Sequence, residues 1–213
     1  MSAGVGVDGR IAELLALGAA TVHEASGGGG ALPHELRPVH PLALAGRALP
    51  VRCPPGDNLA LHEALDVAAP GEVIVATCGD AVDHGYWGEV MAVAALARGL
   101  AGLVIEGCVR DSAALAALGF PVYARGLCVR GTGKDAAASR SVGDPVQFGD
   151  VTVRRGDAVI GDGDGVVVVA AADVDAVRGA ARRRAEREQE QFAQLRAGAT
   201  TMDLLGLRPD GGT

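Results

Sequence analysis

Apolar residues show two different spacings along the first part of the chain. Residues spaced three or four apart predict helices at 10–17, 59–68, 89–98 and 112–118. Short unbroken apolar runs predict strands at 42–45, 48–53, 72–76, 103–105 and 121–124. Pro54-Pro55-Gly56 and Pro70-Gly71 mark turns, and Asn58 stands where a helix cap is expected. Because helices alternate with strands, the pattern predicts an α/β fold.

The second half of the chain changes to short strands separated by turns of glycine and aspartate. These turns are Gly143-Asp144, Gly149-Asp150, Gly156-Asp157 and the stretch 161–165, which reads GDGDG. A calcium loop is one interpretation of GDGDG, but the valine run that follows it favours a hairpin turn entering a strand.

From residue 172 the chain becomes charged and helical. An apolar stripe continues through Val174, Val177, Ala181, Ala185, Phe192 and Leu195. The spacing of Arg182–Glu186 and Arg184–Glu188 is that of ion pairs on a helix surface. No repeat or linker divides the chain, so we expect one domain over residues 1–213 with a charged helical tail at about 172–205. This tail is expected either to dock on the body or a neighbouring subunit, or to present a solvated face.

Length and composition narrow the class of protein. Of 213 residues 49% are hydrophobic, yet no apolar run approaches the roughly 18 residues of a membrane-spanning helix. The net charge is −7 with no basic stripe, which argues against nucleic acid as a partner. The N-terminal sequence lacks the basic and apolar regions of a signal peptide. We therefore expect a cytoplasmic protein that binds neither nucleic acid nor a membrane.

The four cysteines are expected to be free thiols rather than zinc ligands. No two of them form a CxxC pair, and the chain shows no export signal that would favour disulfides. The cysteines are Cys53, Cys78, Cys108 and Cys128.

An Arg-Asp pair follows the predicted strand at 103–105. If the preceding helix begins near Glu89, the backbone amides of its first turn favour an anion, and the strand delivers Arg110 to the same region. The planar guanidinium suits a carboxylate or a keto-acid oxygen, and Asp111 supplies the oxygen ligand that Mg²⁺ or Mn²⁺ prefers. The alternative is a surface ion pair of little energetic value. The first interpretation describes a site for a 2-oxo acid whose enolate is stabilised by a metal.

At these residues the chain resembles the RraA-like family, which includes the 4-hydroxy-4-methyl-2-oxoglutarate/4-carboxy-4-hydroxy-2-oxoadipate aldolases. "WGEVM" followed by "GLVIEGCVRD" is similar to its pattern of a Gly-acidic helix start and a downstream Arg-Asp. "PPGDNLALHEAL", "LGFPVYARG" and "GDGDGVVVV" also resemble family stretches. Their shared order and spacing extend the resemblance over nearly the whole chain.

The resemblance implies a fold and a reaction. The fold is a layered α/β/β sandwich related to swivelling phosphohistidine domains, assembled as a homotrimer or homohexamer with sites near subunit interfaces. The reaction is that of a class II, metal-dependent lyase. It is retro-aldol cleavage of a 4-hydroxy-2-oxo acid to pyruvate, oxaloacetate decarboxylation, or both, through a pyruvate enolate.

The resemblance also assigns roles to residues. Following the pair Gly88-Glu89, the amides of Val90 and Met91 hold the pyruvate carboxylate. Arg110 contacts the pyruvate oxygens and stabilises the enolate. Asp111 holds the divalent metal, Mg²⁺ or Mn²⁺, largely through waters.

Two departures from the family pattern leave a second function open. Ala114 and Ala199 stand where the aldolases often carry acidic residues, so second carboxylates near the metal are missing. The alternative functions are a diverged enzyme with another substrate, or a non-catalytic regulator that binds a ribonuclease. Asp111 favours the enzyme, since the regulators tend to keep the arginine and lack this aspartate.

Several residues near the proposed site have two interpretations. His84 is either a proton-transfer group or a solvated loop histidine, with the second favoured. Asp80 and Asp83 are turn residues or groups that support the site, and the turn is favoured. Trp87 either walls the pocket or packs in the core. The Glu89 side chain either takes part in catalysis or only complements the helix dipole.

Overall fold

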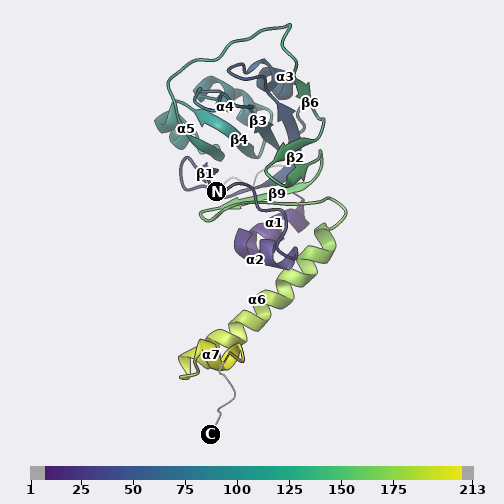
Figure 1. Ribbon diagram of the computed structural model, residues 1–213, viewed down its shortest axis with the longest axis vertical. Helices are drawn as coiled ribbons and strands as arrows, with labels where there is room; N and C mark the ends of the chain where they lie inside the picture. Colours follow the sequence, from purple (N-terminus) through teal and green to yellow (C-terminus); the bar gives the residue numbers. More distant parts are fainter. Residues whose placement is uncertain (1–7, 208–213) are drawn as a thin grey trace.

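The computed structural model describes residues 8–207 and contains one large mixed sheet with helices on its outside (Figure 1). The centre of the sheet consists of four strands in parallel register. They are β2 (Leu44–Arg52), β3 (Glu72–Thr77), β4 (Gly102–Val109) and β5 (Val122–Leu127). Helices connect these strands, as the alternating pattern predicts, so the α/β class is confirmed.

Antiparallel strands extend the sheet on both sides. The short strand β1 (Arg37–Pro38) pairs with β5 at one edge. On the other side β9 (Ala158–Asp162) pairs with β2, and β10 (Gly165–Val169) pairs with β9. The end of β2 also pairs with β6 (Ser141–Val142). A separate hairpin consists of β7 (Val146–Phe148) and β8 (Val151–Val153).

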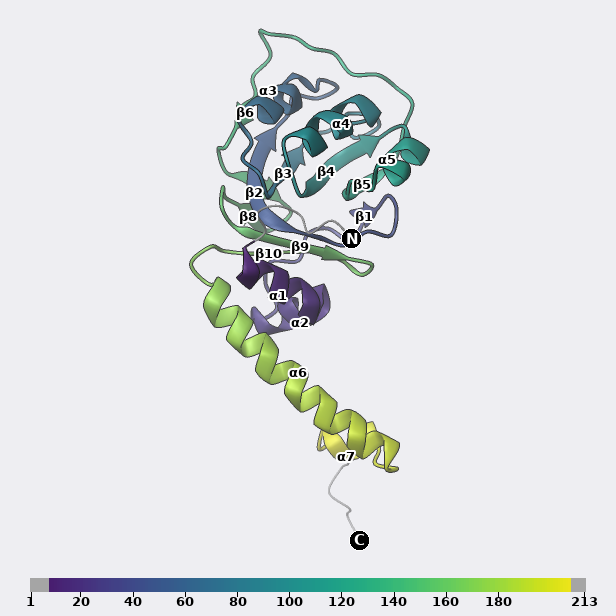
Figure 2. The same cartoon turned by 180° about the vertical axis from the view of Figure 1, so that it is seen from behind.

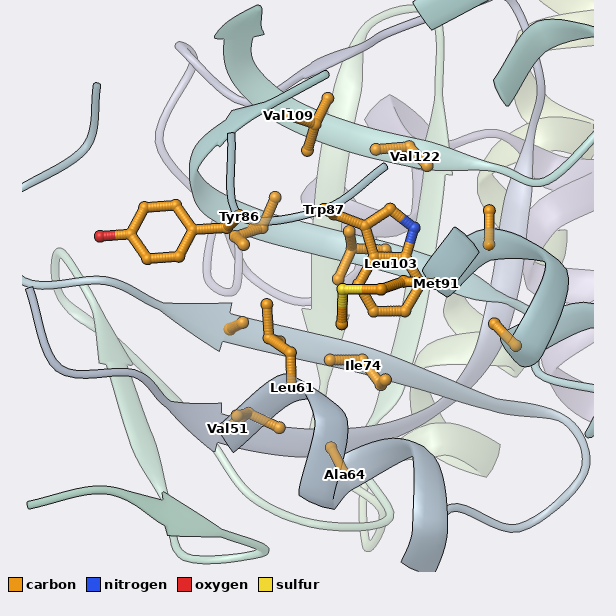
Figure 3. Packing of buried hydrophobic residues seen from close by; sticks show 14 of the residues in the cluster. Val51, Leu61, Ala64, Ile74, Tyr86, Trp87, Met91, Leu103, Val109 and Val122 are labelled. Atoms are coloured by element: carbon orange, nitrogen blue, oxygen red, sulfur yellow. The ribbon is translucent and has the colours of Figure 1, made fainter. Parts of the chain in front are cut away.

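Three helices cover the outer face of the parallel strands. They are α3 (Leu59–Val67), α4 (Glu89–Ala97) and α5 (Ser112–Leu118). Leu61 of α3 and Met91 of α4 point towards Ile74 and Leu103 of the sheet (Figure 3). Trp87 belongs to the same cluster and is 1% exposed. The start of α4 is therefore fixed by burial of the residues on both sides of Gly88.

The opposite face of the same sheet encloses a second core. Valines and leucines of β2, β3, β4, β9 and β10 meet there, and Phe148 of the β7–β8 hairpin packs among them. The sheet is therefore curled, with one core inside it and helices outside. The predicted α/β/β layering is thus confirmed only as a mixed α/β fold with one nearly closed, barrel-like sheet and helices outside it. The likeness to swivelling phosphohistidine domains stays a prediction, as does the division into a single domain.

A third core joins both ends of the chain. α1 (Gly9–Leu17) and α2 (Ala19–Ala25) pack with α6 (Val174–Arg196) on the outer face of β9 and β10. Only the first half of α6 takes part, because its buried residues are Val174, Val177 and Ala181. The second half extends away from the body and leads to α7 (Thr201–Leu204) at the far end (Figures 1 and 2).

The tail follows its prediction in part. Its first half docks on the chain's own body, and Arg184 forms the predicted pair with Glu188 at 2.9 Å. Arg182 instead hydrogen-bonds to Glu13 of α1, a partner that local helix spacing cannot reveal. Thr200 and Asp203 form a capping box at α7, a separate short helix near the end of the tail predicted at about 172–205.

Several smaller predictions are settled by the fold. The GDGDG stretch is the β9–β10 hairpin turn, and the Asp162 carboxylate accepts hydrogen bonds from the amides of Ala19 and Asp164. All four cysteines are free thiols. No helix within residues 8–207 is long and apolar enough to cross a membrane. The prediction about a signal peptide concerns the N-terminal residues, of which 1–7 lie outside the described part.

Candidate functional site

The end of β4 and the beginning of α4 are joined by hydrogen bonds. The Arg110 amide donates to the Trp87 carbonyl at 2.8 Å. One residue later, the Glu89 amide donates to Oδ2 of Asp111 at 3.1 Å. The structure thus brings the Arg-Asp pair to the N-terminus of α4, the arrangement that the order of strand, loop and helix predicts.

Asp111 adopts a conformation that few residues accept. Its φ of 58° and ψ of 38° lie in the left-handed region, and it is the one non-glycine residue with positive φ among residues 8–207. Such a conformation costs on the order of 1 kcal/mol, least for Asp and Asn. A Cβ at Gly88 would lie 2.3 Å from Oδ2 of Asp111. Glycine at 88 and aspartate at 111 therefore permit the close approach of the two segments.

The charges of Arg110 and Asp111 are only loosely paired with each other. Nε of Arg110 lies 3.8 Å from Oδ2 of Asp111, and the two side chains are 49% and 44% exposed. A pair with this exposure adds little to stability. Both groups therefore remain available to a ligand.

A pocket of about 250 Å³ lies beside this pair. It is bounded by the starts of α3 and α4, the end of β4 and the loop before β6. Its lining residues are Asn58, His62, Gly88, Val90, Met91, Arg110, Asp111, Gly131, Thr132 and Lys134. The pocket brings together every residue predicted for the site except Glu89.

The first turn of α4 presents backbone amides at this pocket. The first amides of a helix have no acceptor within the helix, and that of Glu89 is bound by Asp111. Val90 and Met91 supply the next two. The Val90 side chain is 81% exposed, and the Glu89 side chain is exposed outside the pocket lining, as expected of a residue that complements the helix dipole. The predicted substrate contacts at Val90 and Met91 stay a prediction.

The opposite wall of the pocket was not predicted. It consists of Asn58 and His62 at the start of α3 and of the loop that carries Thr132 and Lys134. Asp57 holds the two parts together, because its carboxylate accepts from the Leu59 amide at 2.8 Å and from the Asp135 amide at 2.5 Å. The i,i+4 spacing of Asn58 and His62 was the available signal, but nothing local places residues 131–134 beside them.

Asn58 precedes α3 as predicted, but its side chain does not cap the helix. The capping bond comes from Asp57 instead. The Nδ2 group of Asn58 donates to the Tyr86 carbonyl at 2.8 Å and approaches Sδ of Met91 at 3.6 Å. Asn58 therefore braces α3 against the segment that leads into α4.

Asp111 is the carboxylate that the pocket offers to a divalent cation. No group of three His, Cys, Asp or Glu side chains that could hold a metal occurs among the described residues. Mg²⁺ usually keeps several waters, and the 44% exposure of Asp111 gives water access to it. The donor set fits Mg²⁺ or Mn²⁺ held by one carboxylate and water. It does not fit a metal enclosed by four protein ligands.

For the residues that had two interpretations in the sequence, the structure favours a structural role over a role in the pocket. Trp87 stacks on Phe120 with ring centroids 5.9 Å apart, so it belongs to the core. Nδ1 of His84 lies 3.3 Å from the Ala81 carbonyl, and the ring lies outside the pocket lining. Asp80 lies in an exposed turn, and Asp83 is exposed in the same loop.

The two alanines that depart from the family pattern occupy different regions. Ala114 is half-buried in α5, which begins directly after Asp111. Ala199 lies between α6 and α7, at the far end of the tail from α4 and α5 (Figure 1). Within one chain, position 199 is thus remote from the pocket.

Known proteins resemble this chain in sequence and in fold. A putative 4-hydroxy-4-methyl-2-oxoglutarate aldolase of Halalkalibacterium halodurans is 33% identical over 126 residues, 59% of this chain and 59% of that protein. The match therefore spans less than two thirds of that relative. A crystal structure of an uncharacterized protein from Pseudomonas syringae has a TM-score of 0.81 at 26% identity and covers 97% of this chain and all of the other.

A further solved structure shares the fold. The RNA-processing inhibitor RraA from Thermus thermophilis has a TM-score of 0.64 at 24% identity, covering 70% of this chain and 90% of the other. The sequence pattern of the RraA-like family, described as Aldolase/RraA, matches residues 19–168, which include every residue of the pocket. The chain belongs to the RraA-like family.

Proposed function

We propose that the pocket binds a 2-oxo acid and that the protein is a metal-dependent lyase. Its reaction is retro-aldol cleavage of a 4-hydroxy-2-oxo acid to pyruvate, decarboxylation of oxaloacetate, or both, through a pyruvate enolate. The observation that carries the proposal is the meeting of Arg110, Asp111 and the first amides of α4 in one pocket. The name of the 33% identical relative, a putative 4-hydroxy-4-methyl-2-oxoglutarate aldolase, supports the same class of substrate.

Different groups of the chain bind different parts of the substrate. The amides of Val90 and Met91 receive the carboxylate at the positive end of α4. The fork of Arg110 donates to the keto oxygen, on which negative charge grows as the bond between C3 and C4 breaks. A donor aimed at such a charge typically contributes about 2–4 kcal/mol to the transition state. Because the charge exists only after bond breaking begins, this contact accelerates the reaction rather than only tightening binding.

A divalent cation, Mg²⁺ or Mn²⁺, completes the proposal. Asp111 and bound waters would hold it, and it would supply a Lewis acid that lowers the energy of the enolate. The proposed partner is a small-molecule substrate, without nucleic acid or membrane. The homotrimer or homohexamer remains part of the proposal on the strength of the family resemblance, and so does the cytoplasmic location expected from the sequence.

The proposal is tested by coupled detection of pyruvate release from a panel of 4-hydroxy-2-oxo acids and from oxaloacetate, with and without Mg²⁺. Arg110→Lys is the informative variant, because a lysine keeps the charge and loses the bidentate fork. We expect turnover to fall about 30- to 1,000-fold. Oxalate, a mimic of the enolate, should bind more weakly, while Mg²⁺ binding stays unchanged.

Two results would contradict this function. Equal oxalate affinity in wild type and Arg110→Lys would remove the substrate from Arg110. A wild-type protein without turnover on any member of the panel would favour the alternative, a regulator that binds a ribonuclease. The similarity to the RraA inhibitor supports the shared fold alone, since the identity is 24%.

A further inference from the structure

His62 stands out in the wall of the pocket that the sequence did not predict. It is half-buried at the beginning of α3, one helical turn after Asn58. It lines the same pocket as Arg110 and Asp111, which directly follow β4. Its ring forms no hydrogen bond or ion pair with another residue of the 8–207 range, so no internal partner has to be displaced before the imidazole can act on a ligand.

The pocket contains four ionisable side chains, and only one suits proton transfer near neutral pH. The other three belong to Arg110, Lys134 and Asp111. Histidine alone changes its charge between about pH 5 and pH 8 in its ordinary state. A retro-aldol reaction needs a base that removes the hydroxyl proton. His62 lines the proposed substrate pocket and is the side chain there that can exchange a proton near neutral pH.

The position of His62 relative to the rest of the pocket is fixed from two sides. Asn58 ties the start of α3 to the Tyr86 carbonyl at 2.8 Å, three residues before α4 begins. Asp57 ties the same helix start to the 133–135 loop. A base must be held within reach of the proton that it removes. The hydrogen bonds of Asn58 and Asp57 hold the helix start that carries His62 at the pocket.

The surroundings of His62 favour its neutral form. Burial is the largest cause that lowers its pKa from the usual 6.5, and the positive charge of Lys134 lowers it further. Asp66 and Asp57 act in the opposite direction. The other charged groups of the pocket are Arg110 and Asp111, and neither is bonded to the ring. A neutral imidazole at neutral pH is ready to accept a proton.

We propose that His62 takes the proton from the C4 hydroxyl of the substrate in the retro-aldol step. As the O–H bond breaks, the C4 oxygen forms a carbonyl and the bond between C3 and C4 opens. Its electron pair becomes the C2–C3 double bond of the enolate, whose oxygen faces Arg110. C3 then takes a proton from water, and His62 returns its proton to solvent. The inference rests on the proposed function and names a residue that the family resemblance did not.

The test exploits two routes to one enolate. Oxaloacetate decarboxylation forms pyruvate enolate without removing a hydroxyl proton, whereas retro-aldol cleavage requires that removal. In His62→Gln we expect the kcat of aldol cleavage to fall about 100-fold or more, the range of a lost general base. Decarboxylation should fall much less, so that the ratio of the aldol kcat to the decarboxylation kcat decreases, because only the aldol route removes a hydroxyl proton. The acidic limb of the aldol pH profile should disappear with the histidine.

Two further variants separate proton transfer from a structural role. His62→Ala should recover aldol activity when imidazole is added, which a misfolded pocket cannot do. His84→Gln is the matched control, because this histidine lies outside the pocket, and it should leave both reactions unchanged. Far-UV circular dichroism and the melting temperature of each variant report on the fold.

The outcomes distinguish this inference from the proposed function. An equal fall of both reactions in His62→Gln, or an unchanged aldol rate, would overturn the role of His62 while leaving the lyase intact. Failure of imidazole to restore a folded His62→Ala would also overturn it. A wild-type protein inactive in both reactions would overturn the lyase, and the role of His62 with it.

Discussion

The pocket at the end of β4 and the outer half of α6 differ in how their charged side chains are held in place. At the pocket two charged residues, Arg110 and Asp111, are positioned by backbone contacts with a segment distant in sequence. In the outer tail many charges follow one another, while Phe192, Met202, Leu205 and Leu207 remain exposed. The comparison shows that the number of charged residues is a poor guide to a site. A better guide is a small number of charged residues that another segment of the chain holds in place.

The strongest test of this comparison replaces Asp111 by asparagine. Asparagine accepts the left-handed conformation and keeps an oxygen for the Glu89 amide, so the fold should persist. The charge that would hold Mg²⁺ is lost, and we expect Mg²⁺-dependent pyruvate release to fall about 100-fold or more. Asp83→Asn, an exposed loop aspartate outside the pocket, is the control. Unchanged turnover in Asp111→Asn would remove this carboxylate from the mechanism.

Substitutions in the exposed part of the tail should change the oligomeric state of the protein rather than the stability of the single chain. Phe192 is 40% and Leu205 61% exposed, so the double change to serine alters two surface positions of the single chain and no core residue. The free energy of unfolding should change by no more than about 0.5 kcal/mol. We expect the wild type to be a trimer or hexamer by light scattering, and the variant to have a lower mass. A wild-type monomer at micromolar concentrations would contradict the proposed assembly.

The smallest expected effect concerns the stability of the body against pH. Burial lowers the pKa of His40 and of His62 below the usual 6.5. The unfolded chain therefore binds protons first, and stability is complete above about pH 6.5 and declines as the pH falls below it. The melting temperature should decrease gently between about pH 7 and pH 5.5, and His40→Gln should flatten the decrease.

This pH window separates the histidines from the carboxylates. Hydrogen bonds to Arg182 and Arg140 lower the pKa values of Glu13 and Glu63 below 4.5, so their contribution is lost only in stronger acid. A melting temperature that is constant down to about pH 5.5 would show that these histidines do not influence folding.

Local periodicity was sufficient for helices that carry their own apolar face. The predicted helix at 112–118 has the bounds of α5, and α3 and α4 each end one residue before the prediction. α2 was missed, because Gly18, with φ of 88°, breaks the pattern and the capping oxygen comes from Asp162, far along the chain. Strands at 42–45 and 48–53 proved to be one strand, β2, since pairing with β3 and β9 carries it through Gly46-Arg47.

The candidate site shows the same division between local and distant information. Arg110 and Asp111 could be found because a strand end and a helix start lie on each side of them. β4 was expected to stop at 105, but it continues to Val109, because Cys108 bridges to Gly85 and pairs with Gly126. The wall of Asn58, His62 and Lys134 depends on Asp57 meeting Asp135, a contact between two loops that no periodicity encodes.

The hydrogen bond from the Glu89 amide to Asp111 makes the binding of an anion at this one amide an exchange. An anion that takes this amide must displace a carboxylate that already occupies it. A hydrogen bond to a charged group contributes about 1.5–3 kcal/mol, but here the gain is the difference between two such bonds. Affinity at this amide is then set by competition between an internal anion and an external one. A cation that draws Asp111 away would release the amide, so cation and anion would bind with positive cooperativity.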